Sequence, residues 1–555
     1  MTDEQTPAAS RHYPQRIGPS AQWPADTSAQ WLETNIGDVL RAHARERPER
    51  AAVSWQDGDT LTCLTYSELL AAATRVAQWL LELARPGERI AVWGPNSIEW
   101  FVVEHAAALA GIALTPLNTR LTDPEVEHIL RESGPVVLLA ADDYHGSSLR
   151  SRGEQLAERC ADLAAVRALG GWRSAPPPLA GLRALPDVAP GAPFLVQYTS
   201  GTTGRPKGAL LSHRAALNCA RFFALRLDPG PDEVWCSPLP LHHVGGSITM
   251  LLAALAIGAN YVIVPEFDPV LVLDLAERSH ATFIGGVPTM YVAMLDAPDF
   301  AARDLRSLQG LLCGGSTVPP ALVRRIEKAF GARMVIGYGQ SESPCIAQTW
   351  LDDCDLDKSE TIGQPLPYRD VRIVRPGTSE TAMLQEIGEL CTRSAMTMDG
   401  YVGDTLVSFD VVDADGWLHT GDMCSMDGRG LLRFHGRLRE VIIRGGENIY
   451  PREVEEALMQ HPDIAQIAVV GIADDHWGEE VAAFVLPVPG TAPSVDDLTV
   501  FARTLLAPFK IPRGWVFVSS FPLTASGKIK KHELLAASTG FRRAMTKACS
   551  SEDPY

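Results

Sequence analysis

No two of the ten cysteines form a C-x-x-C pair, so the spacing typical of a zinc ribbon or a disulfide framework is missing. Scattered cysteines of this kind are typical of reduced thiols in a cytoplasmic protein. Residues 1–24 lack the apolar run of a secretory signal, and the longest apolar stretch, roughly residues 248–259, is too short to span a bilayer. We therefore expect a cytoplasmic protein without stable membrane insertion, in which residues 248–259 form a core helix.

An excess of positive charge is also absent. The chain carries 49 lysines and arginines against 67 aspartates and glutamates, a formal net charge of −18. This balance argues against a nucleic acid or an anionic membrane surface as partner, so a site for a polyanion must hold its positive charge locally. At 555 residues the chain is too long for a single core, and we expect roughly two to four structural units.

A stretch rich in threonine, serine and glycine, residues 198–208 (YTSGTTGRPKG), follows an apolar run at 194–198 and precedes an amphipathic segment at 213–226. The apolar run predicts a buried strand and the amphipathic segment a helix. The glycines let backbone N–H groups approach an anion, the hydroxyls add donors, and Lys207 adds a positive charge. A P-loop is excluded, because Gly208 follows the lysine where a P-loop needs serine or threonine. We expect a loop for a pyrophosphate or triphosphate, with a plain surface loop as the alternative.

Strand and helix patterns alternate along most of the chain. Residues 89–93 predict a strand, 97–110 a helix and 112–115 a second strand, and such a unit implies a parallel sheet covered by helices. From Val371 the pattern changes to shorter strands and turns. After about residue 440 the chain restarts with segments that predict a small α+β domain. The fold class is therefore α/β, with a smaller domain near the C-terminal end.

Two glycine-bearing motifs each follow a predicted strand. In residues 313–320 (CGGSTVPP) the paired glycines would let a flat ring lie against the backbone, although a capped turn between strand and helix explains the same letters. In residues 337–342 (GYGQSE) Tyr338 is suited to stack on a base, and Glu342 to bind magnesium, which prefers hard oxygen ligands. An ordinary turn between a strand and a helix is the alternative for this second motif.

Three further motifs lie toward the C-terminal end. Residues 416–422 (GWLHTGD) place Asp422 after a strand and a tight turn, where a carboxylate can accept both hydroxyls of a ribose; an Asx turn is the alternative. Residues 436–451 (GRLREVIIRGGENIYP) are basic, and their paired glycines leave room for the thin chain of a ligand. Residues 522–528 (PLTASGK) carry Lys528 on a glycine-bearing turn, a pattern that alone most often means a solvated lysine.

The order and wording of these five motifs, across roughly residues 35–535, resemble the acyl-adenylate-forming superfamily of acyl-CoA ligases, carrier-protein adenylation domains and luciferases. The resemblance implies a large N-terminal domain of doubly wound sheets plus a β-barrel, and a small mobile α+β C-terminal domain. It implies a site in the cleft between the two. The expected division is a disordered arm at 1–34, the AMP-binding domain at 35–437, the lid domain at 438–538 and a loose tail at 539–555.

The resemblance also assigns roles to single residues. It implies a catalytic function for Lys207, His243, Glu342 and Lys528, with Thr199 and Glu342 as magnesium ligands and Arg439 as the hinge. His242 leaves the register of the histidine slightly open. Ser341 stands where most members have threonine, and it retains the hydroxyl. The expected contacts to ATP and coenzyme A are Thr199, Ser200, Gly201, Thr202, Thr203, Gly204, Lys207, Gly314, Gly315, Ser316, Gly337, Tyr338, Gly339, Gln340, Ser341, Asp422, Arg437, Gly445, Gly446 and Lys528.

The implied activity is that of an ATP-dependent carboxylic acid–CoA ligase, with ATP, magnesium and coenzyme A as its cofactors and co-substrates. Residues 244–247, 285–289 and 343–346 should line the acid pocket, and they are apolar or small. They fit a medium- to long-chain fatty acid or a bulky cyclic or aromatic acid. Because the chain stops soon after Lys528, we expect coenzyme A as the acceptor rather than a carrier protein. Loading of an acyl carrier protein, a non-catalytic nucleotide-binding protein, a luciferase-like oxygenase and a homodimer stay open.

Overall fold

The structure is a computed structural model that describes residues 18–173, 184–199, 206–314, 318, 320–403, 411–445, 447–474, 476–523 and 529–537. Several predicted site residues lie outside these ranges: Ser200, Gly201, Thr202, Thr203, Gly204, Gly315, Ser316, Gly446 and Lys528. The chain forms two compact units. The first comprises residues 1–372, 391–419 and 426–433, and the second comprises residues 373–390, 420–425 and 434–555.

A seven-stranded sheet of the first unit has the order β19-β9-β8-β5-β4-β6-β7. Its strands are β4 (Arg89–Trp93), β5 (Ala113–Leu117), β6 (Val137–Ala140), β7 (Ala165–Ala168), β8 (Pro193–Thr199), β9 (Lys207–Ser212) and β19 (Gly400–Tyr401). Strands β4 and β5 pair in parallel, which confirms the predicted strand–helix–strand unit. Strands β8, β9 and β19 pair antiparallel at one edge.

A nine-stranded sheet of the same unit has the order β16-β15-β14-β13-β12-β10-β11-β2-β3. Its strands are β2 (Ala51–Asp57), β3 (Thr60–Thr65), β10 (Val234–Ser237), β11 (Asn260–Ile263), β12 (Phe283–Gly286), β13 (Gly310–Gly314), β14 (Arg333–Gln340), β15 (Ser343–Gln348) and β16 (Gln364–Pro365). The six strands from β14 to β2 pair in parallel, and antiparallel strands close both edges.

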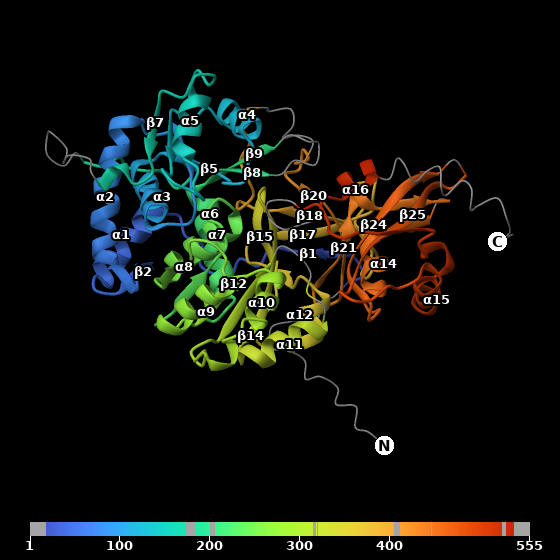
Figure 1. Ribbon diagram of the computed structural model, residues 1–555. Helices are drawn as coiled ribbons and strands as arrows, with labels where there is room; N and C mark the ends of the chain where they lie inside the picture. Colours follow the sequence, from blue (N-terminus) through green and yellow to red (C-terminus); the bar gives the residue numbers. More distant parts are fainter. Residues whose placement is uncertain are drawn as a thin grey trace. The chain divides into compact units, whose positions relative to one another are not determined.

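Helices cover both sheets and fill the space between them, which makes five layers (Figure 1). The helices of this unit are α1 (Ile36–Glu46), α2 (Tyr66–Leu83), α3 (Ile98–Ala110), α4 (Asp123–Ser133), α5 (Leu149–Ala157), α6 (His213–Leu225), α7 (Val244–Gly246), α8 (Ala253–Ile257), α9 (Pro269–Arg278), α10 (Pro288–Leu295), α11 (Pro320–Phe330) and α12 (Asp355–Glu360). Helices α1, α2, α3, α6 and α8 form the middle layer, α4 and α5 cover the seven-stranded sheet, and α9, α10 and α11 cover the nine-stranded sheet.

Alternation of side chains along the strands explains this layering, because successive residues of a strand point to opposite faces. In β4, Ile90 and Val92 join the middle core, while Ala91 and Trp93 pack toward α4 and α5. Each central strand is thus apolar on both faces. Such near-continuous apolar runs are typical of parallel strands between two helical layers.

The apolar stretch at residues 248–259 lies in the middle layer, as predicted for a core helix. It begins with a π-helical turn, η2 (Ser247–Leu252), and continues as α8. Among the residues that the structure describes, no helix combines the length and the apolar character needed to cross a bilayer.

The N-terminal arm predicted as disordered over residues 1–34 is ordered where the structure describes it, from Gly18 onward. Strand β1 (Gln22–Trp23) pairs antiparallel with β17 (Asp370–Val374). The ring of Trp23 lies over Gly430, so close that a Cβ there would stand 2.3 Å from it. The sequence prediction was wrong for this part because a two-residue strand has no periodicity of its own. Residues 1–17 lie outside the described part of the chain.

The shorter strands predicted from Val371 onward are present. A five-stranded sheet has the order β1-β17-β18-β20-β21, and it stands at the place in the chain where the β-barrel was expected. Its remaining strands are β18 (Gly388–Arg393), β20 (Leu418–Met426) and β21 (Leu432–Arg437).

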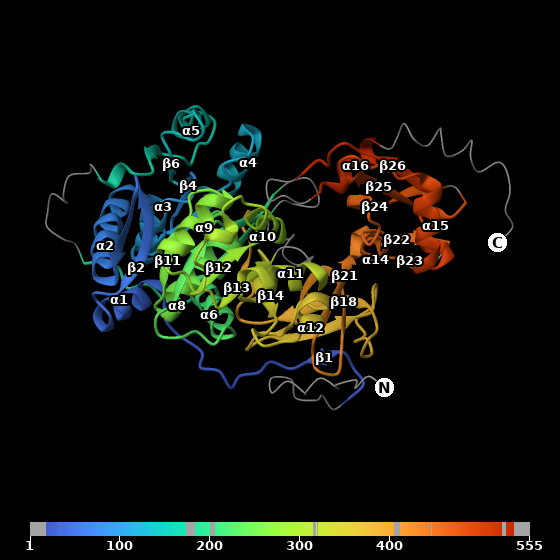
Figure 2. The same ribbon diagram turned by 60° about the horizontal axis from the view of Figure 1, so that its bottom comes forward.

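The second unit contains a small α+β domain, as predicted, and helices pack on both faces of its sheet (Figure 2). Its sheet runs β23-β22-β25-β24, with β26 beside β25. The elements are β22 (Ile442–Arg444), β23 (Glu447–Ile449), α14 (Pro451–Leu458), β24 (Ile464–Asp474), β25 (Gly478–Pro487), α15 (Val495–Leu505), β26 (Gly514–Phe517) and α16 (Lys531–Ala537). Ile467 and Val469 face α14 and α15, while Ala468 and Val470 face α16. The predicted tail at 539–555 lies outside the described residues.

Candidate active site

Two residues that border the glycine-rich stretch face each other across a hairpin. Thr199 ends β8, Lys207 begins β9, and the two are partners in the antiparallel ladder. The sequence analysis expected the stretch to lie between a strand and a helix, and this was wrong. Strand β9 comes first, because the apolar residues after Gly208 extend the sheet, and α6 begins only at His213. The hairpin therefore fixes the position of Lys207 at the start of β9.

Gly208 is required by close packing on this hairpin. A Cβ at this position would lie 2.7 Å from Cγ2 of Val402 and 2.8 Å from the ring of Tyr198. Val402 in turn donates its N–H to the carbonyl oxygen of Gly208, at 2.8 Å. The absence of a side chain therefore lets β19 lie directly against β9.

Tyr401 of β19 contacts two of the predicted catalytic residues. Its ring centroid lies 5.3 Å from Nζ of Lys207, which is within the range of a cation–π contact. Its phenol O–H donates a 2.6 Å hydrogen bond to Oε1 of Glu342. Burial, and then the charge of Glu342, raise the pKa of Tyr401 far above its ordinary value, so the phenol stays protonated. Lysine, tyrosine and carboxylate thus form one continuous group.

Sequence reasoning missed Tyr401 although it named both of its partners. The residue belongs to a two-residue strand whose place is set by β9, since Tyr401 pairs with Ala209. The main chain beside it also reaches the other hairpin, because Met398 N–H donates to the carbonyl oxygen of Glu342 at 2.8 Å. No local pattern in the sequence marks such a long-range pairing.

Glu342 lies in the two-residue turn between β14 and β15, in which Gln340 pairs with Ser343. The turn therefore joins two antiparallel strands, and the alternative of a turn between a strand and a helix was wrong. Gly339 is needed here, because a Cβ would lie 2.3 Å from the backbone nitrogen of Cys345. Ser341 is buried beside Glu342 in the same turn.

Gly314 and Gly337 are neighbours at the carboxyl ends of the parallel strands β13 and β14, the edge where ligands bind in open α/β sheets. A Cβ on Gly337 would lie 2.8 Å from Cε2 of Phe223, whereas a Cβ on Gly314 would approach only the carbonyl oxygen of Gly337, at 3.2 Å. Among the residues that the structure describes, no side chain therefore comes within 4 Å of the place where a Cβ of Gly314 would stand. The expected contact of Gly314 and Tyr338 with adenine stays a prediction.

His243 caps the short helix α7, where its Nδ1 accepts the N–H of Gly245 at 3.0 Å. The neighbouring His242 is half-buried, and its carbonyl oxygen accepts the side-chain amide of Gln197 at 2.9 Å. Burial lowers the pKa of His242 to about 3, with smaller effects from His243 and Arg120. The neutral form of His242 is therefore favoured, and His243 is the more exposed histidine of the two.

In the second unit Asp422 and Arg437 form an ion pair, with Oδ1 of the carboxylate 3.5 Å from Nε of the guanidinium. Asp422 lies within β20, and its backbone N–H donates to the hydroxyl of Thr420 at 3.1 Å. Arg439 follows in the 3₁₀ turn η4 (Leu438–Glu440). Partial burial and then the charge of Arg437 lower the pKa of Arg439. The ribose contact and the hinge stay predictions.

Gly445 has a left-handed backbone, with φ of 58°. The space into which a Cβ of Gly445 would project is occupied, because that Cβ would lie 2.8 Å from the ring of Trp477. Gly445 N–H also donates to the carbonyl oxygen of Trp477 at 2.7 Å. The space that the sequence analysis assigned to a ligand's thin chain is therefore occupied by an indole at this glycine.

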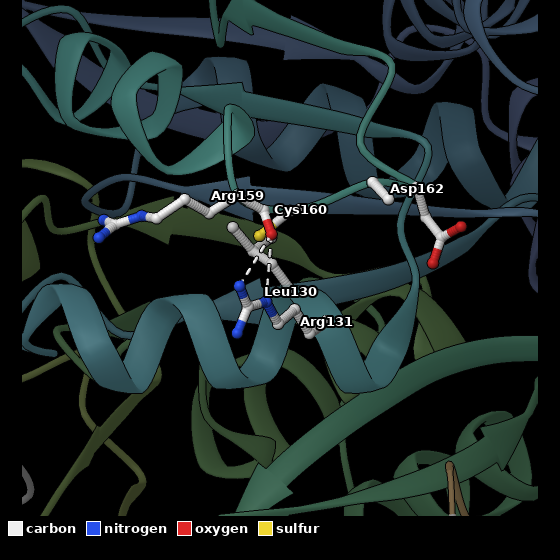
Figure 3. A pocket seen from close by; sticks show the side chains of 6 residues that line it. Leu130, Arg131, Arg159, Cys160 and Asp162 are labelled. Carbon is white, nitrogen blue, oxygen red and sulfur yellow. Dashed lines mark hydrogen bonds between the residues drawn. The ribbon is translucent and has the colours of Figure 1, made fainter.

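A hollow of about 250 Å³ lies elsewhere on the first unit, between α4 and the segment before β7 (Figure 3). It is lined by Leu130, Arg131, Arg159, Cys160, Ala161 and Asp162. The guanidinium of Arg131 donates two hydrogen bonds to the carbonyl oxygen of Arg159, at 3.1 and 3.0 Å. The arginine is thus engaged by the protein, and none of the predicted site residues lines this hollow.

Residues 40–402 match the family described as AMP-binding enzyme, and residues 453–528 match the family described as AMP-binding enzyme C-terminal domain. The chain belongs to the AMP-binding enzyme family. Within the family it belongs to the acyl-CoA synthetase and ligase branch, on the strength of the relatives that follow.

The medium-chain acyl-CoA ligase ACSF2 of Homo sapiens, a mitochondrial protein, is 33% identical over 540 residues, which cover 90% of this chain and 86% of the relative. The feruloyl-CoA synthase of Amycolatopsis sp is 37% identical over 509 residues, covering 90% and 98%. The crystal structure of ATP-bound MatB from Rhodopseudomonas palustris is similar with a TM-score of 0.83 at 25% identity, covering 92% of this chain and 100% of that one. The similarity extends over both units of the AMP-binding enzyme fold.

Proposed function

We propose that this chain is an ATP-dependent carboxylic acid–CoA ligase that acts through an acyl-adenylate. Membership of the AMP-binding enzyme family and relatives named as CoA ligases support the proposal. The observation that carries it in this chain is the group formed by Lys207, Tyr401 and Glu342. It joins a cation on the glycine-rich hairpin to a carboxylate on the neighbouring sheet, and such a pair suits a polyphosphate with its metal ion.

In the first half-reaction an oxygen of the acid attacks the α-phosphorus of ATP. The bond from this phosphorus to the bridging oxygen breaks, and pyrophosphate leaves. A carboxylate is a weak nucleophile that the phosphates repel, so the site must neutralise both partners and hold them in line. We assign stabilisation of the pyrophosphate to Lys207, and contact with the acid and the α-phosphate to Lys528.

Thr199 and Glu342 supply a hydroxyl and a carboxylate, the hard oxygen donors that suit magnesium. The hydrogen bond from Tyr401 fixes the orientation of the Glu342 carboxylate. When bound, the ion would neutralise negative charge on the leaving pyrophosphate. We assign the adenine to the strip at Gly314, Gly337 and Tyr338, and the ribose hydroxyls to Asp422 with Arg437.

In the second half-reaction the sulfur of coenzyme A attacks the carbonyl carbon of the acyl-adenylate. The carbon–sulfur bond forms, the carbon–oxygen bond to phosphate breaks, and AMP leaves with the electron pair. We assign the change between the half-reactions to a rotation about Arg439, since Lys528 and the thiol need the same approach. Loading of a carrier-protein thiol is the second candidate, because its first half-reaction is identical.

The proposed acid is a medium- to long-chain fatty acid or a bulky cyclic or aromatic acid. Residues 244–247, 285–289 and 343–346 offer apolar or small side chains, and Val244, Cys345 and Ile346 are buried. One relative is named for medium-chain acids and another for ferulic acid, an aromatic acid. Both kinds of acid therefore belong in the first assay.

The test is pyrophosphate release from ATP and magnesium, measured with a panel of fatty acids from six to sixteen carbons and of cinnamic and benzoic acids. We expect release that depends on one class of acid, and a thioester when coenzyme A is added without any carrier protein. A thioester only with a carrier protein would favour the second candidate. Absence of acid-dependent release with every acid would contradict the proposal.

A further inference from the structure

Helix α3 carries an ionisable side chain in the middle of a buried layer. Every residue of α3 except Glu99 is buried, and Glu104 is only 2% exposed. A buried polar group costs free energy unless hydrogen bonds satisfy it. Apart from Glu104 and His105, the buried side chains of α3 are apolar or aromatic, so this buried carboxyl needs hydrogen-bond partners.

Two donors satisfy the carboxyl of Glu104. The hydroxyl of Ser247 donates to Oε1 at 2.6 Å, and the indole N–H of Trp100 donates to Oε2 at 3.3 Å. Trp100 lies one turn earlier on the same helix, so it adds no connection between elements. The bond to Ser247 does, because it ties α3 to the start of the π-helical turn η2.

Ser247 uses its hydroxyl in an unusual way for a residue in a helix. Serine and threonine inside helices commonly donate to the carbonyl oxygen four residues earlier, and Thr249 does this with Gly245 at 2.5 Å. The backbone N–H of Ser247 donates to the carbonyl oxygen of His243 at 3.0 Å, whereas its hydroxyl donates to the carboxyl of Glu104 on α3. A π-helical turn is a costly local conformation that is often found at functional sites, and this bond supports it.

The segment that precedes the turn is held tightly. The side-chain amide of Gln197, on the strand that ends at Thr199, donates to the carbonyl oxygen of His242 at 2.9 Å. A Cβ on Gly246 would lie 2.1 Å from the carbonyl oxygen of Pro240, so the two backbone segments are in close contact there. Residues 243–246 are thus fixed on one side to the glycine-rich hairpin and on the other to α3.

We propose that Glu104 and Ser247 are positioning residues for the acid substrate. Their hydrogen bond anchors the π-helical turn, and through it the neighbouring residues 244–246 of the proposed acid pocket; in this respect the inference rests on the proposed function. The hydroxyl of Ser247 is turned toward Glu104, so the pair acts through the backbone of the turn. The pair sets the shape of one wall of the pocket from behind, and it leaves the nucleotide site unchanged.

Three variants test the pair by steady-state kinetics of pyrophosphate release. Glu104→Ala and Ser247→Ala should each raise KM for the acid by about tenfold, the size expected for a lost hydrogen bond to a carboxylate, and leave KM for ATP within about twofold. Glu104→Gln keeps an acceptor for Ser247 and should restore most of the affinity for the acid. The double alanine variant should be no worse than either single variant, because both remove the same bond.

Glu233 offers a matched control, since it is also 2% exposed and also accepts a threonine hydroxyl, that of Thr282, at the amino ends of strands β10 and β12. Glu233→Ala should lower stability without changing KM for the acid. An equal rise in KM with this variant, or none with Ser247→Ala and Glu104→Ala, would overturn the proposal.

Hydrogen exchange gives a reading that does not depend on activity. In Glu104→Ala the amides of residues 243–252 should exchange faster than in the wild type, and in Glu233→Ala they should not. Unchanged exchange in Glu104→Ala would refute the anchoring, whatever the enzyme does. If the wild type shows no acid-dependent release while the exchange result holds, the proposed function fails and the anchoring stands.

Discussion

Tyr401 and Glu342 are joined by a 2.6 Å hydrogen bond in which the phenol is the donor. The two residues come from different sheets and stand 59 positions apart in the chain. Through the ring of Tyr401 the bond extends to Lys207, whose Nζ lies 5.3 Å from the ring centroid. The orientation of a proposed magnesium ligand and that of a proposed phosphate ligand thus depend on one side chain.

Replacing Tyr401 by phenylalanine should weaken the response to magnesium. The variant keeps the ring beside Lys207 but leaves Glu342 without its donor, so the carboxylate is held in its orientation less well. We expect roughly a three- to tenfold higher magnesium concentration for half-maximal pyrophosphate release, as for the loss of one hydrogen bond to a partly exposed carboxylate. Titration of activity with magnesium at saturating ATP measures this change.

Tyr66→Phe is the control, because Tyr66 is buried and donates to the carbonyl oxygen of Ala259 far from the hairpins. It should cost stability and leave the magnesium titration unchanged. If Tyr401→Phe and wild type need the same magnesium concentration, the phenol does not orient Glu342 for the metal.

Gly208→Ala should disturb the same group by a steric route. The new methyl would overlap Val402 and the ring of Tyr198, and β19 with Tyr401 would have to move away from β9. Overpacking of this kind costs about 1–3 kcal/mol, and KM for ATP should rise. Gly191→Ala, which meets no atom within 4 Å, should change neither quantity. Thermal unfolding and steady-state kinetics with ATP measure the two changes. Equal stability and equal KM for ATP in Gly208→Ala and Gly191→Ala would contradict the packing argument.

Glu104 should give the stability of the first unit a characteristic pH dependence. Burial raises the pKa of Glu104 from 4.5 to about 7, against hydrogen bonds from Ser247 and Trp100 that act to lower it. Between these two values the folded protein retains a proton that the unfolded chain has lost. Stability is therefore fully present below about pH 4.5, falls as the pH rises, and levels off above about pH 7. The shift corresponds to roughly 3 kcal/mol.

The side chain of the Glu104→Gln variant cannot ionise, so its free energy of unfolding lacks this dependence on pH. The free energy of unfolding of the variant minus that of the wild type should therefore rise by roughly 3 kcal/mol between pH 4.5 and 7, as measured by urea unfolding. Burial lowers the pKa of His105 and His213 to about 4, which acts in the opposite direction, but it does so in both proteins and cancels in the difference. A difference that stays constant over this range would show that Glu104 is not a titrating buried group.

Much of the fold follows from local pattern. The strand at Arg89–Trp93 and the helix that ends at Ala110 appear where two apolar runs, separated by turn residues, predict them. Residues 65–68 (TYSE) have the sequence pattern of a capping box, and in the structure the side chain of Glu68 bonds back to the N-cap residue Thr65. The small α+β domain is predictable for the same reason, since β24 and β25 alternate between two cores.

Other features that sequence reasoning missed depend on partners distant in the chain. Strands β1 and β19 have two residues each, and only their pairing with β17 and β9 gives them a place. Tyr401 becomes part of the candidate site through that pairing alone. Glu104 lies in an apolar helix, and its meaning appears only when the fold brings Ser247 beside it.

Asp422→Asn should impair ATP binding specifically through the ribose. Asparagine has nearly the same shape, but it is neutral and has one acceptor oxygen, so it accepts hydroxyl hydrogens less strongly. KM for ATP should rise by about tenfold with KM for the acid unchanged.

Wild-type protein should also lose affinity with 2′-deoxy-ATP, whereas in the variant the missing hydroxyl should have little further effect, because its partner is already weakened. Asp413→Asn is the matched control, since Asp413 also pairs with an arginine, Arg372, at 3.4 Å, and it should leave the whole penalty for the deoxy nucleotide in place. The loss of affinity caused by Asp422→Asn and the loss caused by the deoxy nucleotide could instead add in full. In that case Asp422 does not accept the ribose hydroxyl.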